Sequence, residues 1–301
     1  MCPSKAELVR AAGILRAGGL VAFPTETVYG LGANALDEAA VRRIYEAKGR
    51  PSTSPLIVHI ADLAMAPRVA AEWPESAQKL AARFWPGPLT LILRKQSEVP
   101  ALVTAGLDTV GVRMPVHPMA LELIRLAGVP VAAPSANRFM EISPTTAEHV
   151  RLGLGDRVDC ILDAGPCEVG IESTVLSLAG GRHVLLRPGM ILRRQIEEII
   201  GPVDLASQPA AGAGHVSPGL HRRHYAPKTP LYLLDAGEAL PEGRGRLLTL
   251  PGEPVSFAAR LYSELHAADR EGWEWIAIRK PPATGEWAGI LDRLTRASRR
   301  E

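Results

Sequence analysis

The feature that most limits the fold of this chain is a repeated alternation of short apolar segments and amphipathic helical segments over residues 1–205. Gly18-Gly19 separates the first helix from the first strand, and Pro51 prevents the second helix, which Asp37 would cap, from continuing. Strands interleaved with helices predict a mixed α/β or α+β domain. The predicted strands are 20–23, 56–60, 89–93, 110–115, 129–134, 160–163, 174–178 and 183–187, and the predicted helices are 5–17, 38–48, 75–84, 118–127, 143–155 and 193–200.

This alternation stops at residues 206–230, which contain four prolines, three glycines and no aliphatic periodicity. Such a composition is typical of an interdomain linker, and the simplest interpretation is a solvated tether. Beyond it, residues 231–301 predict a small separate α/β unit near the lower size limit for an independent core. Its strands are expected at 231–235, 246–250 and 275–278, and its helices at 255–267 and 286–297.

Charge and cysteine content exclude several classes of protein. The 34 Lys and Arg against 32 Asp and Glu give a net charge of +2, which does not indicate a general polyanion binder. The three cysteines show no metal-ligand spacing, so we expect a reducing compartment without a disulfide framework. Because we find neither a leader-like N-terminus nor an apolar run long enough to span a membrane, we expect a cytoplasmic protein without a membrane partner.

Polar residues recur at the predicted strand ends. Thr25 and Thr27 follow the first strand, Lys48 and Arg50 flank Gly49, and Ser135 and Asn137 follow the strand 129–134. Alternate residues on an extended backbone face one side, so each pair is expected to project together. Further polar residues lie within or beside the predicted strands, and Ser143 precedes Pro144 as a predicted helix N-cap. The residues in or beside strands are Ser54, His59, Thr109, Arg113, Ser173 and Arg187.

Each of these residues also has a purely structural interpretation. Thr25 and Thr27 could cap a turn, Lys48 and Arg50 could complement a helix dipole, and His59 could be a satisfied strand histidine. There is no Walker A loop and no GxGxxG motif. From the residues alone, the chain therefore predicts a polar, arginine-rich pocket for a phosphorylated or carboxylated ligand, and no particular reaction.

Taken together, the motifs resemble those of the threonylcarbamoyl-AMP synthases, the YrdC-type family in its two-domain long form. The similar stretches occur in order over about residues 1–231, and a Lys-x-Arg (Lys48, Arg50) paired with a Ser-x-Asn (Ser135, Asn137) is the family signature. The stretches are FPTETVYGLGANA (23–35), KGRPSTSPLIVHI (48–60), FWPGPLTLIL (84–93), VGVRMP (110–115), APSAN (133–137), SPTTAEHV (143–150), IESTV (171–175), LRPG (186–189) and SPGLHRRHYAPKTPL (217–231).

The resemblance implies a fold and a reaction. The fold is a twisted mixed sheet around a concave cavity, followed by a small Rossmann-like α/β domain. The reaction is that of a nucleotidyltransferase, which makes L-threonylcarbamoyladenylate and pyrophosphate from L-threonine, bicarbonate or CO2, and ATP with Mg2+. Its product would serve the tRNA threonylcarbamoyl transferase proteins that form threonylcarbamoyladenosine.

The resemblance also implies residue roles, with no metal ligand among the protein side chains. Under it, the linker 206–230 becomes a lid over the site rather than a tether, with Tyr225 over its mouth. Lys48, Arg50, Ser135 and Asn137 would be catalytic; Thr27, His59, Arg113 and Ser173 would bind threonine; and Arg50, Ser54, Thr109, Ser135, Ser143 and Arg187 would bind the nucleotide.

Two departures from the family pattern stand out. Arg138-Phe139-Met140-Glu141-Ile142 replaces the usual Ser-Gly, and the C-terminal unit is short. Two alternatives stay open at this stage: an RNA-binding module that uses a concave basic surface, and a related carbamoyl-transfer domain. The aromatic content of 5% offers few stacking platforms for RNA.

Overall fold

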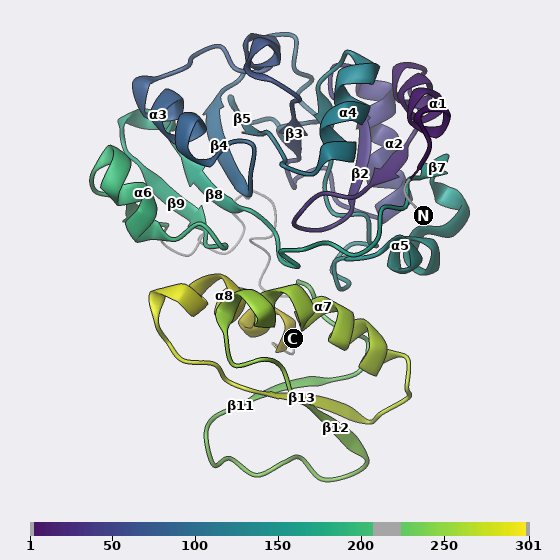
Figure 1. Cartoon of the computed structure of the whole chain (residues 1–301), viewed down its shortest axis with the longest axis vertical. Coiled ribbons are helices and arrows are strands. Elements are labelled where there is room, and N and C mark those ends of the chain that lie inside the picture. Colours follow the sequence, from purple (N-terminus) through teal and green to yellow (C-terminus); the bar gives the residue numbers. More distant parts are fainter. Residues whose placement is uncertain (1–2, 207–223, 299–301) are drawn as a thin grey trace.

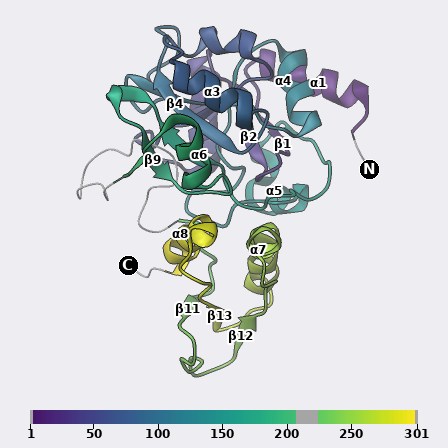
Figure 2. The same cartoon turned by 60° about the vertical axis from the view of Figure 1, so that its left-hand side comes forward.

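The computed structural model describes residues 3–206 and 224–298, which form two α/β domains. The N-terminal domain, residues 3–206, contains a ten-stranded sheet, and the C-terminal domain, residues 231–298, contains a three-stranded sheet. Figure 1 shows the C-terminal domain below the larger one, with its helices α7 (Pro254–Asp269) and α8 (Ala288–Ser298) between its own sheet and the N-terminal domain. Figure 2 shows the same arrangement from another side.

The large sheet is mixed, as the resemblance implies. Its strands are β1 (Val21–Phe23), β2 (Gly30–Asn34), β3 (Ile57–His59), β4 (Leu89–Arg94), β5 (Thr109–Arg113), β6 (Val131–Ala132), β7 (Cys160–Ile161), β8 (Thr174–Ser177), β9 (Val184–Arg187) and β10 (Asp204–Leu205). They are ordered β10-β9-β8-β4-β5-β3-β6-β2-β1-β7. The pairs β10–β9, β8–β4, β5–β3 and β1–β7 are parallel, and the other neighbours are antiparallel.

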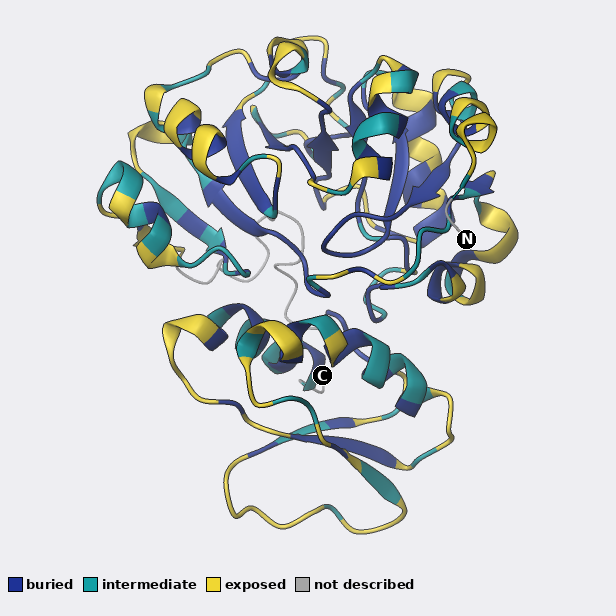
Figure 3. Ribbon diagram, viewed as in Figure 1, coloured by how far each residue is buried: buried dark blue, intermediate teal, exposed yellow. Residues whose placement is uncertain are grey.

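Helices cover this sheet where the sequence periodicity predicts them. They are α1 (Lys5–Arg16), α2 (Glu38–Lys48), α3 (Glu75–Phe84), α4 (Pro118–Ala127), α5 (Ala147–Leu154) and α6 (Arg193–Ile200). Asp37 caps α2 as predicted, because its carboxylate accepts from the backbone N–H of Ala39 and Ala40. Figure 3 shows that the strands are mostly buried and that the outer faces of the helices are exposed.

Two local predictions are wrong. The sequence predicts a polar turn over residues 24–32, but residues 30–34 form β2, in which Gly32 lies against the Phe23 ring and a Cβ would come within 2.7 Å of it. This glycine therefore serves close packing rather than turning. Helix α5 is capped by Thr146, whose hydroxyl accepts from His149 N, and not by Ser143. The carbonyl of Pro144 instead accepts from Tyr29 N, so the chain is still a loop at that point.

The C-terminal domain has the predicted order of elements. Its strands are β11 (Leu231–Leu234), β12 (Gly245–Leu248) and β13 (Trp275–Arg279), ordered β11-β13-β12 and all parallel. The connection 235–244 contains no helix, and both α7 and α8 lie on the face of the sheet toward the N-terminal domain (Figures 1 and 2). The domain is thus parallel α/β but differs from a doubly wound Rossmann sheet, which carries helices on both faces.

The two domains share apolar packing at their junction. Val28, Ile142 and Ile171 of the N-terminal domain belong to the same buried cluster as Leu261 and Ile290 of the C-terminal domain. Continuous burial across the junction makes the C-terminal domain part of the structure that surrounds the site described next.

Candidate functional site

A cavity lies where several strands of the large sheet end, beside the segment that leads into the C-terminal domain. The sheet topology explains why distant residues meet there. His59 and Arg113 end the parallel strands β3 and β5 in register, while Ser173 precedes β8 and Arg187 ends the antiparallel β9. The predicted site residues that line the cavity are Thr27, Arg50, His59, Arg113, Ser135, Ser173, Arg187 and Tyr225.

On one side of the cavity, Arg113 is held by two neighbours. Its Nη1 donates to Thr27 Oγ1 at 2.9 Å and its Nη2 donates to Glu26 Oε1 at 2.6 Å. The side chains of Arg113 and Glu26 are only 5% and 4% exposed. The guanidinium is therefore fixed before any ligand arrives, which favours binding of a carboxylate.

His59 lies beside this arginine with an uncommitted ring atom. Its Nδ1 is buried without a hydrogen-bond partner among the described residues. Burial, and then the charge of Arg113, lower the pKa of His59 to about 3. The imidazole is therefore neutral near pH 7, and its Nδ1 is available to a polar ligand atom in the cavity.

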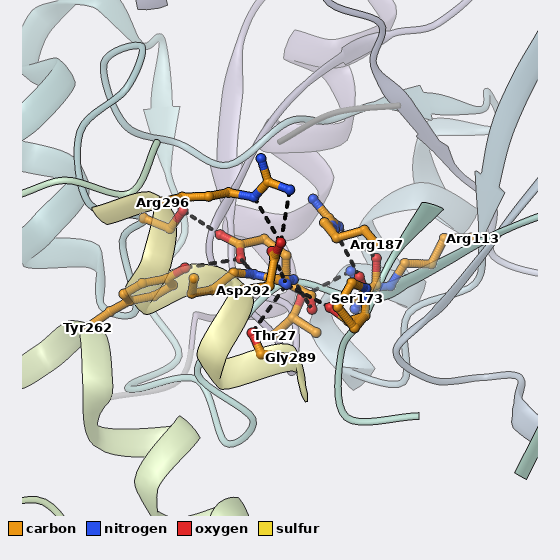
Figure 4. A network of polar contacts seen from close by, with 12 residues as sticks. Thr27, Arg113, Ser173, Arg187, Tyr262, Gly289, Asp292 and Arg296 are labelled. Atoms are coloured by element: carbon orange, nitrogen blue, oxygen red, sulfur yellow. Dashed lines mark hydrogen bonds and ion pairs between the residues drawn. The ribbon is translucent and has the colours of Figure 1, made fainter. Parts of the chain in front are cut away.

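Arg187 and Ser173 form a second polar side of the cavity (Figure 4). Arg187 Nε donates to the carbonyl of Ser173 at 3.1 Å, and its Nη2 donates to Ser173 Oγ at 3.2 Å. Ser173 Oγ is also 2.8 Å from Thr90 Oγ1. Burial lowers the pKa of Arg187, because the cation is removed from water in the cavity wall.

Arg50 supplies a third cation. Its Nη2 donates to Ser54 Oγ at 2.6 Å and to the carbonyl of Pro55 at 3.0 Å, so Ser54 orients the guanidinium. Burial lowers the pKa of Arg50 to about 10, which still leaves it charged near pH 7.

The structure corrects the basis on which Lys48 and Arg50 were paired. The segment is not extended, because Lys48 is the last residue of α2 and Gly49 has a left-handed φ of 63°. Lys48 Nζ points to the Ser-x-Asn loop and donates to the carbonyls of Ser135 at 2.6 Å and Asn137 at 2.5 Å. Burial, and then the charge of Arg50, lower the pKa of Lys48 well below its usual value.

Lys48 and Asn137 thus lie behind the cavity rather than in its lining. Asn137 Nδ2 donates to the carbonyls of Arg138 at 2.7 Å and Glu141 at 2.9 Å, which fixes the loop that carries Ser135. The four signature residues are in one place, but only Arg50 and Ser135 face the cavity.

Thr109 and Ser143 also lie outside the lining. Thr109 is the first residue of β5, at the opposite end of that strand from Arg113. Ser143 is buried and donates to Glu172 Oε1 at 2.5 Å. Their nucleotide-binding roles stay predictions.

Sequence reasoning missed Glu172, a carboxylate that lines the cavity at the domain junction. Glu172 Oε2 accepts from Arg293 Nε at 2.9 Å and from the Tyr262 hydroxyl at 3.1 Å. Burial alone would raise the pKa of Glu172, but the charges of Arg293 and Arg187 outweigh it and lower the pKa. A glutamate within the apolar stretch around Ile171 was the only available signal, because a buried carboxylate needs a partner.

Tyr225 lies between this junction and the cavity. It is 1% exposed, has a left-handed φ of 63°, and its hydroxyl has no hydrogen-bond partner within the described ranges. Its ring stacks 5.9 Å from that of Tyr262, and the Arg293 guanidinium lies 5.5 Å from its centroid. A strained backbone and an unsatisfied buried hydroxyl are typical of a residue placed for a ligand.

The unusual 138–142 loop packs against residues 224–226, which lie beside the cavity. The Phe139 ring contacts His224 edge-on at 6.1 Å, and Ala226 N donates to the carbonyl of Met140 at 3.0 Å. Most of the predicted lid, 206–230, lies outside the described residues, so the structure places only its end, from His224 onward.

Two further observations concern metals and membranes. Within residues 3–206 and 224–298, no three His, Cys, Asp or Glu side chains cluster as metal ligands would. Across the same residues, no helix combines the length and apolarity needed to cross a bilayer.

The N-terminal α/β domain has a cavity at its strand ends that is lined by arginines and hydroxyl groups, and it is joined to a second α/β domain. This arrangement is typical of an enzyme that acts on small anionic molecules. Residues 13–189 match the Sua5/YciO/YrdC family, described as telomere recombination, and residues 191–299 match the C-terminal domain of threonylcarbamoyl-AMP synthase. The boundary between the two matches falls before α6, although α6 packs on α3 and β10 pairs with β9 in the N-terminal domain.

Individual relatives cover nearly the whole chain. The chain is 43% identical to the threonylcarbamoyl-AMP synthase of Bacillus subtilis, across 97% of this chain and 93% of the relative. It superposes on Sua5 of Pyrococcus abyssi complexed with L-threonine with a TM-score of 0.93 and 39% identity, covering 99% and 96% of the two chains. Escherichia coli YciO covers only 62% of this chain, with a TM-score of 0.55 and 26% identity.

The chain therefore belongs to the threonylcarbamoyl-AMP synthase family, in its two-domain form, and is an enzyme of the nucleotidyltransferase type.

Proposed function

We propose that the protein makes L-threonylcarbamoyladenylate and pyrophosphate from L-threonine, CO2 or bicarbonate, and ATP. The observation that carries this proposal is the meeting of Arg50, Arg113 and Arg187 in one cavity with hydroxyl groups from distant segments. An amino acid carboxylate and a triphosphate together need several fixed cations in one site. The L-threonine complex of the related Pyrococcus abyssi protein supports the choice of amino acid.

The first step would take place beside Arg113. The threonine amine, as the neutral base, forms a bond to the carbon of CO2 and loses a proton, which gives a carbamate. We assign the threonine carboxylate to Arg113, and the other polar groups of the amino acid to Thr27 and His59. A neutral His59 suits this step because it adds no positive charge beside an amine that must lose its proton.

The second step would take place beside Arg50 and Arg187. A carbamate oxygen attacks the α-phosphorus of ATP, the bond from that phosphorus to the bridging oxygen breaks, and pyrophosphate leaves. This transfer depends on positioning and on charge neutralisation rather than on a covalent protein nucleophile. We assign the phosphates to Arg50, Arg187 and Ser135, which line the cavity, and Lys48 would act by holding the loop of Ser135.

Mg2+ would enter as part of the Mg–ATP substrate. We expect phosphate oxygens and water to supply its ligands.

The buried position of the arginines disfavours the alternative of an RNA-binding module. Arg50, Arg113 and Arg187 are 7%, 4% and 3% exposed, so a duplex backbone could not reach them. In our proposal tRNA is instead the final acceptor. The adenylate passes in the cytoplasm to transferase proteins that modify tRNA.

The test is pyrophosphate release with ATP, Mg2+, L-threonine and labelled bicarbonate. We expect release that requires both threonine and bicarbonate, with the label incorporated into the adenylate. Release independent of threonine would contradict the proposal. No release together with salt-sensitive RNA binding would contradict it and favour the RNA-binding alternative.

A further inference from the structure

Glu26 is a buried carboxylate that neither the family signature nor the cavity lining includes, yet it contacts the arginine we assign to the amino acid. Its side chain is 4% exposed, and both of its oxygens are engaged. Oε1 accepts from Arg113 Nη2 at 2.6 Å, and Oε2 accepts from the backbone N–H of Val116 at 3.2 Å. Its carbonyl also accepts from Val169 N at 2.7 Å, so the residue is fixed through its backbone as well.

A chain of hydrogen bonds, each with an assigned donor, leads from Arg113 through Thr27 to Thr25, in the segment that follows β1. Thr25 Oγ1 lies 2.7 Å from the carbonyl of Val28, which can only accept, so the Thr25 hydroxyl proton is assigned there. We assign the Thr27 hydroxyl proton to Thr25 Oγ1, because this 2.8 Å contact is shorter than those of the backbone N–H groups of Thr27 and Val28 to the same oxygen, at 3.2 and 3.3 Å. Thr27 Oγ1 in turn accepts from Arg113 Nη1 at 2.9 Å. The hydroxyl proton of Thr27 is thus committed, and Thr27 can only accept from a ligand.

These assignments define which groups at this side of the cavity donate hydrogen bonds to a ligand and which accept them. Arg113 donates to Glu26, Thr27 and the carbonyl of Gly87, which uses three of its five N–H groups and leaves two as donors. Donors on Arg113 next to an acceptor on Thr27 match an amino acid, whose carboxylate accepts and whose amine or hydroxyl donates.

We propose that Glu26 is a positioning residue for amino acid recognition, which holds Arg113 so that its remaining N–H groups meet the substrate carboxylate. This inference rests on the proposed function, in which threonine is the substrate. Glu26 contacts no substrate in this scheme and acts through Arg113.

The contacts explain why a carboxylate is needed at this position. Both partners of Glu26, Arg113 Nη2 and Val116 N, are donors. A glutamine would turn its own NH2 group toward one of them, whereas a carboxylate accepts from both. An aspartate keeps the charge but is shorter by one methylene, so it cannot keep both contacts in the same geometry.

The experiment compares two ligands in each variant. Dissociation constants for L-threonine and L-threoninamide, which lacks the carboxylate charge, are measured for the wild type, Glu26→Gln and Glu26→Asp. We expect the wild type to prefer threonine, Glu26→Gln to lower this preference at least about tenfold, and Glu26→Asp to fall between them. The ratio of the two constants is internal to each sample, so partial unfolding of a variant does not affect it.

Steady-state kinetics give a second readout. In Glu26→Gln the KM for threonine should rise at least about tenfold and the KM for ATP should change less than about twofold. Glu122→Gln is the matched control, because Glu122 pairs with Arg125 on an exposed face of α4, and it should behave as the wild type.

The possible outcomes distinguish a failure of the Glu26 proposal from a failure of the proposed function. An unchanged or larger preference for threonine in Glu26→Gln would overturn the positioning role, since Glu26 would then only offset the charge of Arg113. If Glu26→Gln does not fold, a Glu26→Asp variant with the wild-type ratio would overturn it equally. A wild type without threonine-dependent pyrophosphate release would instead contradict the proposed function itself.

Discussion

The two polar sides of the cavity are built in different ways. The strand-end wall (Thr27, His59 and Arg113) comes from the N-terminal domain alone, and its arginine is fixed by a neighbour in that domain, Glu26. The junction wall (Glu172, Arg187 and Tyr225) depends on the C-terminal domain, because Arg293 and Tyr262 hold Glu172 from α8 and α7. Only the second wall should therefore respond to events in the other domain.

This difference assigns a role to the C-terminal domain. Arg293 is 1% exposed, and its guanidinium donates to the carboxylate and to the backbone carbonyl of Glu172, as well as to the carbonyl of Pro188 at 2.6 Å. Figure 4 shows Arg187 and Ser173 on one side of this network and Tyr262 and Asp292 of the C-terminal domain on the other. The second domain thus acts on the cavity through Glu172, although none of residues 231–298 lines the cavity itself.

The largest expected effect comes from breaking the junction wall. Arg293→Met should lower the free energy of unfolding by about 3–5 kcal/mol, because it leaves Glu172 as a buried charge without its main partner. Urea denaturation measures this change. Arg194→Met is the control, because Arg194 also bridges the domains, to Glu286, but both side chains are exposed, and its loss should amount to less than about 1 kcal/mol. Equal losses in the two variants would show that burial of the Glu172 pair is not what joins the domains.

Acid should weaken the same junction next. His149 and His266 stack across it with centroids 3.8 Å apart. Burial, and then neighbouring charges that include Arg270, lower the pKa of His149 to about 3, and burial lowers that of His266 to about 4. Since the unfolded pKa is about 6.5, the unfolded chain binds more protons between pH 6.5 and 4, and stability should fall as the pH falls through this range.

The free energy of unfolding should fall by up to about 1.4 kcal/mol per pH unit for each ring, and by less for His266, which keeps some solvent contact. Denaturation curves between pH 7 and 5 measure it, and His266→Gln should flatten the slope. A variant with the wild-type slope would mean that these rings do not set the acid sensitivity of the junction.

A matched pair of arginine substitutions sharpens the comparison between the walls. Lysine keeps the charge but loses the planar fork, so Arg113→Lys should raise the KM for threonine about tenfold and Arg187→Lys should do the same for ATP, each a loss of about 1.4 kcal/mol. Steady-state kinetics with each substrate varied in turn give these values. Both variants affecting the same substrate would remove the distinction between the walls.

The smallest expected effect is that of Tyr225→Phe. Because the Tyr225 hydroxyl is buried without a hydrogen bond in the described part of the chain, its removal should leave the melting temperature unchanged or slightly higher. Ligand affinity should nevertheless fall by about 1 kcal/mol, or roughly fivefold, if the hydroxyl contacts a bound substrate. Calorimetric titration with threonine and an ATP analogue measures this. Unchanged affinity for both would return the segment around Tyr225 to the role of a tether.

The sequence predicted part of the strand-end wall, because apolar periodicity placed His59 and Arg113 in short strands and the resemblance then assigned both to the threonine site. In the junction wall, Arg187 and Tyr225 were expected from the resemblance, but Glu172 was not, because it meets Arg293 only when α8 docks, 121 residues further along the chain. Similarly, Lys48 and Asn137 were predicted to line the site, and the structure places them behind it because the helix end and Gly49 redirect Lys48. Local patterns predict where a polar residue sits along an element, whereas its partner depends on tertiary packing.

A structure of the protein with both L-threonine and a non-hydrolysable ATP analogue tests the central claim most directly. Our account predicts both ligands in the one cavity, with the threonine carboxylate within hydrogen-bond distance of Arg113 and the phosphates beside Arg50 and Arg187. A structure in which either ligand lies outside this cavity, or in which the phosphates contact none of these arginines, would contradict it.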